Sequence, residues 1–348
     1  MGQSIALLDR LWGRGKDFLG VEYPILGGAM SWISESKLVS AISEAGGFGV
    51  IAGGNMPPDK LKDEIQKTGD ATDKPFGVNL ISIAPNFRSH LDLILELEFP
   101  YVIFAGGLPP RDAINQVKKT KSKLICFAPT VGIAQSLIKA GVDALIIEGH
   151  EAGGHIGPVS TSVLAEQILP KTKEVPVFIA GGIGSGLLMM HYLLMGASGI
   201  QFGTKFAVAE ESPAHANFKE ALIKASSKDA LPTAQFDPRM PVIPVRAIAN
   251  DGTRDFNTLQ LGLVAQLERE TITPQEAFVK LEEFWIGGLR KAAIEGDVEG
   301  GSVMAGQSVG LVKDVKSCKA IIEELLREAM EEAERINGHF CGCVDESD

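Results

Sequence analysis

One short stretch of the chain combines glycines with titratable side chains. Residues 147–158 read IEGHEAGGHIGP and follow an apolar run. Histidine can act as a general acid or base near neutral pH, and glycine lets a backbone approach a flat ligand closely. The stretch therefore predicts a loop with proton chemistry, carried by His150 or His155. For either residue, a solvated loop histidine without a catalytic role is the alternative.

A second pattern predicts phosphate binding. The segments GGIGSG (181–186) and QFGTK (201–205) offer glycine amides, and Lys205 can add positive charge. The amides that we expect to be open are those of Gly181, Gly182, Gly184 and Gly186. A dinucleotide fingerprint fits poorly, because its third glycine would fall at Leu187 and no acidic residue follows about twenty residues later. A simple turn at a helix start is the other alternative.

The elements that would position these loops repeat along the chain. Eight apolar runs, rich in Val, Ile and Phe, read as strands: 23–28, 47–54, 76–81, 101–107, 124–130, 143–149, 175–182 and 199–204. Helical patterns alternate with them: 34–45, 59–67, 87–97, 111–119, 133–140, 162–169 and 186–195. We expect Ser34 to cap the first of these helices.

This alternation predicts an α/β fold, a (β/α)8 TIM barrel, because nearly continuous apolar strands are typical of parallel sheets covered on both faces. A doubly wound sheet is the alternative. In such a barrel the carboxyl ends of the strands form the active face. Glycine or polar residues stand at nearly every predicted strand end, among them Asn79 and Glu148.

After Thr204 the sequence has few strand-like runs and several helical patterns, which predicts a division of the chain into segments. We expect an N-terminal extension (1–22), a barrel core (23–204), a mostly helical insertion or lid (205–295), a return to the barrel with a closing helix (296–336) and a disordered tail (337–348). The closing helix is the charged amphipathic stretch 317–336.

Composition narrows the function classes. The 348 residues are 45% hydrophobic, enough for a large core, and the net charge of −11 argues against nucleic acid or an anionic membrane as a partner. No apolar run is long enough to span a membrane. The start of the chain lacks a secretory pattern and misses the myristoylation pattern at Ala6.

The 4 cysteines give little indication of disulfides or metal. With few cysteines and no secretory pattern, we expect a reduced, cytoplasmic protein. The tail carries His339, Cys341 and Cys343, but a metal site would need more ligands than the tail offers. We therefore expect an exposed tail and no metal.

Several motifs together resemble one flavoprotein family. EAGGHIGP, GGIGSG, GIQFGTKF and GSVMAGQSVGLV resemble the FMN-dependent nitronate monooxygenases, formerly called 2-nitropropane dioxygenases. GGAMSWI, IAGGN, DKPFGVN, EGHEAGGHIG, ESPAHANFKEALIKA, VRAI and GDVEGGSVMAGQ resemble more closely their relatives, the type II enoyl-acyl-carrier-protein reductases. The resemblance runs from about Tyr23 to Arg335, and only the combination of motifs is specific.

The resemblance implies a TIM barrel with one noncovalent FMN and a catalytic histidine at His155. It places the FMN contacts at Met30, Asn79, Glu148, Gly153, Gly182, Gln201, Phe202, Gly203 and Thr204. Ser302, Met304 and Gln307 become candidates for the flavin or nicotinamide side, with a structural helix start as the alternative. Many nitronate monooxygenases have Gln at the position of Glu148, whereas the reductases have Glu. The chain departs from the family's Q-G-G-M after the first strand by reading G-G-A-M.

The implied activity is reduction of 2-enoyl thioesters by NAD(P)H through FMN, in fatty acid biosynthesis. The alternative is a monooxygenase that oxidises alkyl nitronates with O2, and a noncatalytic flavin- or phosphate-binding barrel is a third class. An acyl carrier protein partner is acidic, so docking would need a basic patch on this acidic chain. The candidates for that patch are Arg239, Arg246, Arg254, Arg290 and Lys291. A homodimer is also expected.

Overall fold

The computed structural model describes residues 2–240 and 243–341, and a sheet of parallel strands lies at its centre. The 8 strands are β1 (Ile25–Gly27), β2 (Gly49–Ala52), β3 (Phe76–Ile81), β4 (Tyr101–Ala105), β5 (Lys123–Phe127), β6 (Ala144–Glu148), β8 (Val177–Ala180) and β9 (Gly199–Phe202). Their order is β1-β9-β8-β6-β5-β4-β3-β2, and a parallel bridge between Leu26 and Phe48 joins the two edge strands. Each strand falls within or next to a predicted apolar run, and the predicted TIM barrel is confirmed.

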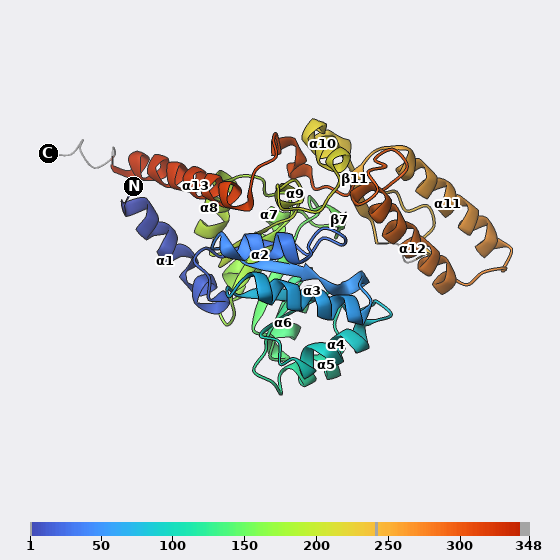
Figure 1. The fold of residues 1–348 in the computed structure, drawn as a ribbon, viewed down its shortest axis with the longest axis horizontal. Coiled ribbons are helices and arrows are strands. Elements are labelled where there is room, and N and C mark those ends of the chain that lie inside the picture. Colours follow the sequence, from blue (N-terminus) through green and yellow to red (C-terminus); the bar gives the residue numbers. More distant parts are fainter. Residues whose placement is uncertain (1, 241–242, 342–348) are drawn as a thin grey trace.

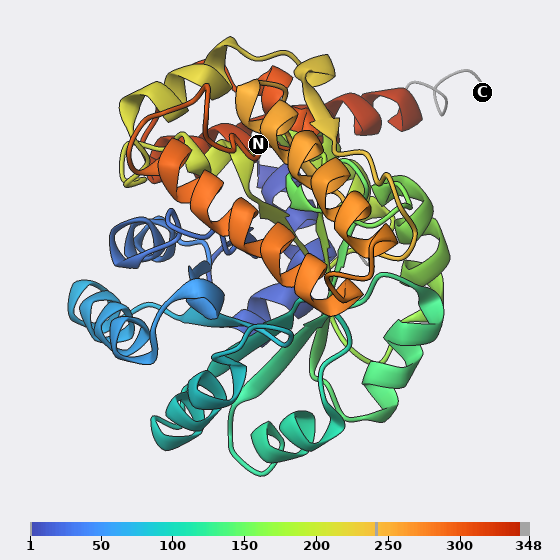
Figure 2. The same ribbon diagram turned by 90° about the vertical axis from the view of Figure 1, so that its right-hand side faces the viewer.

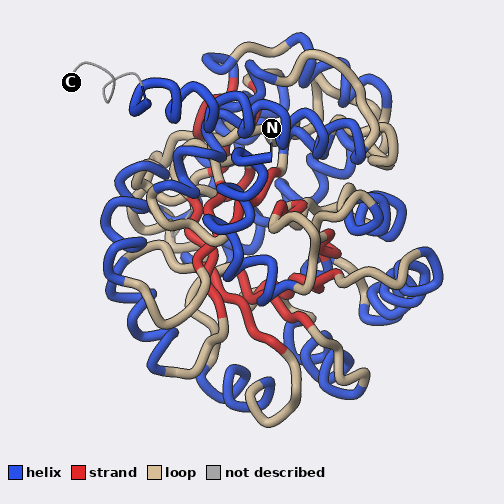
Figure 3. Tube along the Cα trace, turned by 90° about the vertical axis from the view of Figure 1, so that its left-hand side faces the viewer, coloured by secondary structure: helices blue, strands red, loops and turns tan. Residues whose placement is uncertain are grey.

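A layer of helices surrounds these strands (Figure 3). The helices are α2 (Ser36–Glu44), α3 (Pro58–Ala71), α4 (Phe87–Glu96), α5 (Arg111–Val117), α6 (Val131–Lys139), α7 (Thr161–Ile168), α8 (Gly186–Leu194) and α9 (Thr204–Ala207). Short 3-10 helices are η1 (Gly53–Asn55), η2 (Leu169–Lys171), η3 (Ser227–Asp229) and η4 (Gln307–Leu311). The strands are apolar on both faces because one face meets these helices and the other fills the barrel.

The predicted N-terminal extension forms a helix, α1 (Gly2–Leu19), whose end closes one mouth of the barrel. Leu19 is fully buried and belongs to the same apolar cluster as the barrel-filling Phe48 and Phe178. The Tyr101 hydroxyl lies 3.0 Å from the Phe18 carbonyl oxygen and 2.8 Å from that of Leu19. Because Tyr101 begins β4, α1 covers the amino ends of the strands and leaves the carboxyl ends for a site.

The insertion at 205–295, which we call the lid, is mostly helical, as the sequence indicates. It contains α10 (Ala216–Lys224), α11 (Asp251–Glu268) and α12 (Pro274–Ala293), with α11 and α12 packed around Phe256 and Trp285. Capping boxes at Asn250 and Thr273 begin the two long helices. Figure 2 shows this helix pair, in orange, lying across one face of the barrel.

A small antiparallel sheet joins the lid to the barrel and was not predicted. Its order is β10 (Ala230–Pro232), β11 (Val245–Ile248) and β7 (Gly154–His155). Val245 pairs with His155, and Arg246 pairs with Gly154. The glycine-rich loop after β6 is therefore held as a short strand against the lid.

The closing helix α13 (Cys318–Cys341) packs on α8 and α1, near the N-terminus in Figure 1. The prediction that it ends at Ile336 is wrong, because its hydrogen-bonded pattern continues into the expected tail as far as Cys341. The remainder of that tail, residues 342–348 with Cys343, lies outside the described residues. Among the helices of the described residues, none is long and apolar enough to cross a membrane.

Candidate active site at the carboxyl ends of the strands

Three polar side chains point into the open mouth of the barrel. Side chains of a strand alternate between its faces, and Ile146 of β6 belongs to the barrel interior, so Glu148 faces inward as well. A side chain at Gly77 would meet the interior residue Phe48, and one at Gly199 would meet Phe178. Two residues later on the same faces stand Asn79 and Gln201. The strands therefore bring together Asn79 and Glu148, which were predicted at the active face from their positions, and Gln201, which only the family resemblance named.

These side chains have few partners within the protein. The Asn79 amide nitrogen lies 3.5 Å from the Ile103 carbonyl oxygen, the limit of a hydrogen bond. Among the described residues, the side chains of Glu148 and Gln201 have no hydrogen-bond partner. Burial raises the pKa of the Glu148 carboxyl to about 8. The Glu148 side chain can therefore donate a hydrogen bond near neutral pH, when it is protonated.

The loop after β1 reaches the same mouth, and Ser34 holds it. The prediction that Ser34 caps α2 is wrong: Glu35 occupies that position without a side-chain cap. The buried Ser34 hydroxyl instead donates to the Gly28 carbonyl oxygen at 2.7 Å and accepts from the Met30 amide at 3.0 Å. The Met30 sulfur lies 3.9 Å from where a side chain on Gly203 would begin. Met30 therefore meets the loop after β9, as a shared ligand site would require.

The turn after β8 has the backbone that the glycines predict. Gly181 and Gly182 have φ values of 91° and 75°, which favour glycine. A Cβ on Gly182 would lie 2.7 Å from the Cβ of Glu151, whose carboxylate accepts hydrogen bonds from Thr161. The amides of residues 182–184 find no acceptor among the described residues. These amides are available to an anionic ligand.

Two residues of the predicted phosphate site, Gly186 and Lys205, already bond carboxylates of α13. The Gly186 amide donates to the Glu328 carboxylate at 2.7 Å, and a side chain on Gly186 would run into the backbone of α13. The Lys205 ammonium pairs with Glu324 at 2.7 Å and donates to the Gly184 carbonyl oxygen at 3.2 Å. The expectation of an open Gly186 amide is therefore wrong, and the Lys205 charge is already neutralised by α13.

Other predicted contacts are available only in part. The Phe202 side chain packs outward among the helices, at 6.4 Å from the Phe206 ring, so only its backbone can face a ligand. The Thr204 hydroxyl accepts from the Gly306 amide at 3.0 Å. A Cβ on Gly153 would lie 2.5 Å from the Ala305 carbonyl carbon. Packing therefore requires glycine at position 153, because the backbone of residues 305–306 lies against it.

The two histidines have different surroundings. The His150 ring nitrogen Nδ1 lies 2.9 Å from the Gly157 carbonyl oxygen, and its backbone amide donates to Val159 at 2.7 Å. His150 therefore folds the loop back on itself. His155 belongs to β7, is exposed, and turns its Nε2 toward Glu282 of α12 at 3.3 Å. Each ring therefore has one engaged nitrogen, in His150 within its own loop and in His155 with the lid.

The chain segment after the lid supplies the remaining predicted residues. Met304 forms an antiparallel bridge with Ala247, and its sulfur lies 3.7 Å from where a side chain on Gly154 would begin. The backbone amide of Gln307 donates to the backbone carbonyl oxygen of Glu151 at 2.9 Å. Ser302 is 2% exposed under α12, with its amide bonded to Gly288. Met304 and Gln307 thus adjoin the histidine loop, whereas Ser302 contacts the lid.

The expected basic docking patch is not free. Arg246 is 1% exposed, and its guanidinium donates to the His150 carbonyl oxygen at 3.2 and 3.0 Å and to the Ala230 carbonyl oxygen at 2.6 Å. Its assignment to a docking patch is therefore wrong, because a buried side chain cannot meet a partner. The other four candidates each pair with a carboxylate, namely Arg239 with Asp237, Arg254 with Asp251, Arg290 with Glu295 and Lys291 with Asp297.

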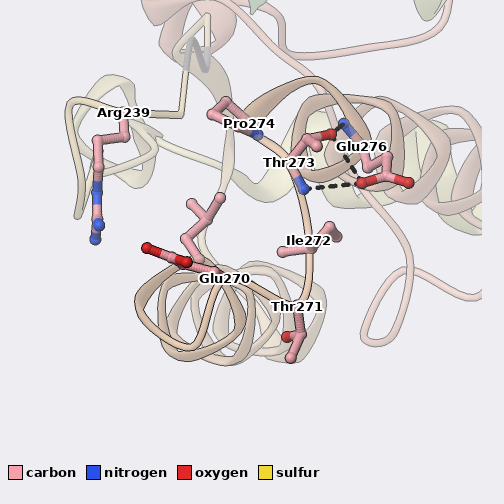
Figure 4. Close-up of a pocket in the computed structure, with 8 residues that line it drawn as sticks. Arg239, Glu270, Thr271, Ile272, Thr273, Pro274 and Glu276 are labelled. Atoms are coloured by element: carbon pink, nitrogen blue, oxygen red, sulfur yellow. Dashed lines mark hydrogen bonds between the residues drawn. The ribbon is translucent and has the colours of Figure 1, made fainter.

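A pocket of about 380 Å³ lies elsewhere, at the tip of the lid (Figure 4). Arg239, Leu267 and residues of the turn between α11 and α12 line it. Its lining includes no residue of the strand ends or of the histidine loop. It is therefore separate from the candidate site.

The residues at the barrel mouth fit a planar cofactor with a phosphate. Asn79, Glu148 and Gln201 can bond the polar edge of a flat ring, and residues 182–184 offer amides to an anion. Gly28 and Gly203 leave room against the backbone. Three residues hold the loops in place: the sequence analysis gave Ser34 and Arg246 other roles, and it missed Glu282. The motif VRAI includes Arg246, but its bonds to the histidine loop could be found only from the fold.

Comparison with known proteins gives a family match over most of the chain. The family described as "Nitronate monooxygenase" matches residues 14–86 and 80–328. A "(3aS,4S,5R,7aS)-5-hydroxy-7a-methyl-1-oxo-octahydro-1H-indene-4-carboxyl-CoA dehydrogenase" from Rhodococcus jostii is 28% identical over 342 residues, covering 90% of this chain and 94% of that protein. A "Probable nitronate monooxygenase" from Staphylococcus aureus is 29% identical, covering 66% of this chain and 78% of that protein.

Two solved structures are similar to this chain over most of its length. FabK from Thermotoga maritima superposes with a TM-score of 0.83 at 37% identity, covering 94% of this chain and 98% of that one. Nitroalkane oxidase from Streptomyces ansochromogenes has a TM-score of 0.76 at 24% identity, covering 92% of this chain and 99% of that one. The second likeness shows the fold alone.

Proposed function

The chain belongs to the nitronate monooxygenase family and is an oxidoreductase, and from this premise we propose that it uses FMN to reduce 2-enoyl thioesters with NAD(P)H. The observation that carries the proposal is a set of polar groups at the mouth of the barrel: Asn79 with one long hydrogen bond, Glu148 and Gln201 without a side-chain partner among the described residues, and the amides of residues 182–184, which also lack an acceptor there. This set suits a flat ring with a polar edge and a phosphate.

The proposed FMN contacts are the predicted ones, with the restrictions that the packing imposes. Met30 and Gly203 would face the ring from neighbouring loops, Gly182 would lie at the phosphate, and Phe202 and Thr204 would contribute mainly backbone. When bound, the flavin supplies hydride transfer between a nicotinamide and a carbon acceptor. The protein's own part is to bind, to orient and to handle protons.

His155 is the residue to which we assign proton handling or orientation of the thioester carbonyl. It stands on β7, directly after the glycine pair, and its ring is exposed. Met304 and Gln307 adjoin this loop and would line the same side as the nicotinamide or the substrate. We assign the role to His155 rather than to the neighbouring His150, whose Nδ1 is bonded to Gly157 within its own loop.

A thioester is favoured over a nitronate by three observations. The motifs resemble the type II enoyl-acyl-carrier-protein reductases more closely than the monooxygenases, and Glu148 stands where many monooxygenases have glutamine. In addition, the Rhodococcus relative acts, by its name, on a carboxyl-CoA, which is also a thioester. For an acyl carrier protein to dock at the lid, its acidic groups would have to compete with the carboxylates that already pair with Arg239, Arg254, Arg290 and Lys291.

The second candidate function is a nitronate monooxygenase, favoured by the Staphylococcus relative. There His155 would remove a proton or orient the substrate, and O2 would be the oxidant.

The test is a pair of histidine variants on two substrates. His155→Ala should lower turnover of an enoyl thioester with NAD(P)H by about 10²-fold or more, because positioned proton transfer contributes about that much. His150→Ala should reduce it far less, and FMN should stay bound in both variants. An alkyl nitronate with O2 is assayed in parallel. Loss of turnover in His150→Ala but not in His155→Ala would show that the wrong histidine was chosen.

A further inference from the structure

We propose that Glu282 of the lid helix α12 is a positioning residue for His155, so that the lid fixes the reactive imidazole from outside the barrel. The inference rests on the proposed function, because it takes His155 as the residue that handles the proton. It adds a lid residue that lies 127 positions further along the chain.

The contact between the two side chains is specific in its geometry. Nε2 of His155 lies 3.3 Å from Oε1 of Glu282 and 3.3 Å from Oε2, so the ring faces the whole carboxylate. The His155 side chain is 42% exposed and that of Glu282 is 22% exposed. Nδ1 of His155 has no partner among the described residues. One ring nitrogen is therefore engaged by the lid and the other is free for a substrate.

The lid also holds the backbone that carries the histidine. His155 pairs with Val245 of β11, and the Ile156 amide donates to the Pro244 carbonyl oxygen at 2.9 Å. Both partners belong to the lid segment. Backbone and ring of His155 are thus fixed by two separate parts of the lid, the small sheet and α12.

The position of α12 is itself determined by contacts with the barrel side. The Gly288 carbonyl oxygen of α12 accepts from the Ser302 amide at 2.8 Å. The Arg290 guanidinium lies 5.9 Å from the Trp32 ring in the loop after β1. On the inner face of the helix, Leu281 and Trp285 are buried in the lid core on either side of Glu282. Glu282 is therefore presented to His155 by a helix anchored on both sides.

A carboxylate at this place has a defined chemical effect. When Nε2 carries the proton, the imidazole donates to Glu282, which sets both the ring orientation and the tautomer. Nδ1 is then the nitrogen that meets the substrate. The same arrangement of an imidazole oriented by a carboxylate recurs in unrelated enzymes. Because the pair is partly exposed, its effect on stability is expected to be small.

The alternative is an ordinary surface ion pair, and a matched control separates the two. Glu283 is the next residue on the same helix and is exposed, without an ion pair among the described residues. We compare Glu282→Ala, Glu282→Gln and Glu283→Ala in the FMN-loaded enzyme, each with and without His155→Ala. Turnover is measured on whichever of the two substrates the wild type converts, together with flavin content and melting temperature.

We expect Glu282→Ala to lower kcat about tenfold, with flavin content and melting temperature unchanged, because an orienting carboxylate acts on turnover rather than on folding. Glu282→Gln should retain more activity, because its amide oxygen still accepts a hydrogen bond. Glu283→Ala should match the wild type. In the His155→Ala background, Glu282→Ala should have no further effect, since its target is gone.

A second readout does not depend on turnover. Diethyl pyrocarbonate acylates accessible imidazoles, and mass spectrometry of the peptide containing His155 gives the rate of labelling at this site. We expect faster labelling of His155 in Glu282→Ala than in the wild type or in Glu283→Ala. Equal labelling in all three proteins would overturn the contact itself.

The outcomes distinguish a failure of the role proposed for Glu282 from a failure of the proposed function. If His155→Ala lowers turnover but Glu282→Ala behaves like Glu283→Ala, the proposed function stands and the role of Glu282 is refuted. An equal loss from Glu282→Ala with and without the histidine would also refute it. If His155→Ala keeps wild-type turnover, the assignment of His155 fails, and the role of Glu282 fails with it.

Discussion

Replacing Glu148 with glutamine should make the stability of the protein less dependent on pH. Burial raises the pKa of this carboxyl from 4.5 to about 8 in the folded protein. In the unfolded chain the carboxyl ionises near its ordinary value. Between these two pH values the folded state keeps a proton that the unfolded state releases. The native state therefore loses stability as the pH rises from about 4.5 toward 8.

The magnitude follows from the gap between the two values. A gap of this size corresponds to roughly 5 kcal/mol at about 1.4 kcal/mol per pH unit. Glu148 is partly exposed at the open mouth, and water reduces the effect. We therefore expect the native state to lose about 1–3 kcal/mol of stability over this pH range, because solvent screening makes the loss smaller than for a fully buried carboxyl. Glutamine has a similar shape and cannot ionise, so Glu148→Gln avoids this loss.

The assay is urea unfolding of flavin-free wild type and variant between pH 4.5 and 8.5. Glu148→Gln should be similar to the wild type at the acid end and should gain on it steadily as the pH rises. Glu283→Gln, on an exposed part of α12, is the control for loss of a carboxylate and should show no such trend. A difference between Glu148→Gln and wild type that is constant across pH would refute the burial of Glu148.

Three further predictions follow from the site. The purified protein should be yellow and should release FMN on heating, and a colourless protein that takes up no added FMN would contradict the cofactor assignment. Gly182→Val should lower the ratio of FMN to protein, because φ is 75° at this glycine and a Cβ would lie 2.7 Å from that of Glu151. Gly69→Val, at an open position of α3, is the control for folding. Full FMN occupancy in Gly182→Val would contradict the assignment of the turn after β8 to the phosphate. Arg246→Leu should lower the free energy of unfolding by about 2 kcal/mol or more, because it leaves buried carbonyl groups of His150 and Ala230 without donors. A change below about 0.5 kcal/mol in urea unfolding, the range of ordinary surface substitutions, would contradict this account of Arg246.

The barrel could be predicted from the sequence because its signals are local. Each strand is a short apolar run between turns, and a polar residue in the carboxyl half of a run, such as Asn79 or Glu148, reaches the active face in a barrel of this kind. The choice between the barrel and a doubly wound sheet rested on counting strands. The bridge between Leu26 and Phe48 settles it by joining the two edge strands.

The contacts that hold the site depend on long-range pairing and could not be predicted. β7 has only 2 residues within a glycine-rich loop, and it is a strand only because β11 of the lid pairs with it. Arg246 reads as a surface charge in the sequence, but it is buried because its guanidinium bonds the histidine loop. Ser34 resembles a helix cap, yet its hydroxyl bonds the loop after β1. In each case the partner lies outside the local pattern.

The most direct test of the proposed function is the addition of NADH or NADPH to the FMN-loaded protein without oxygen. The visible absorption of the flavin should bleach rapidly with one of the two nicotinamides, and a 2-enoyl thioester added afterwards should restore it. If neither nicotinamide bleaches the flavin while an alkyl nitronate is oxidised in the presence of O2, the protein is a monooxygenase and the reductase proposal is wrong.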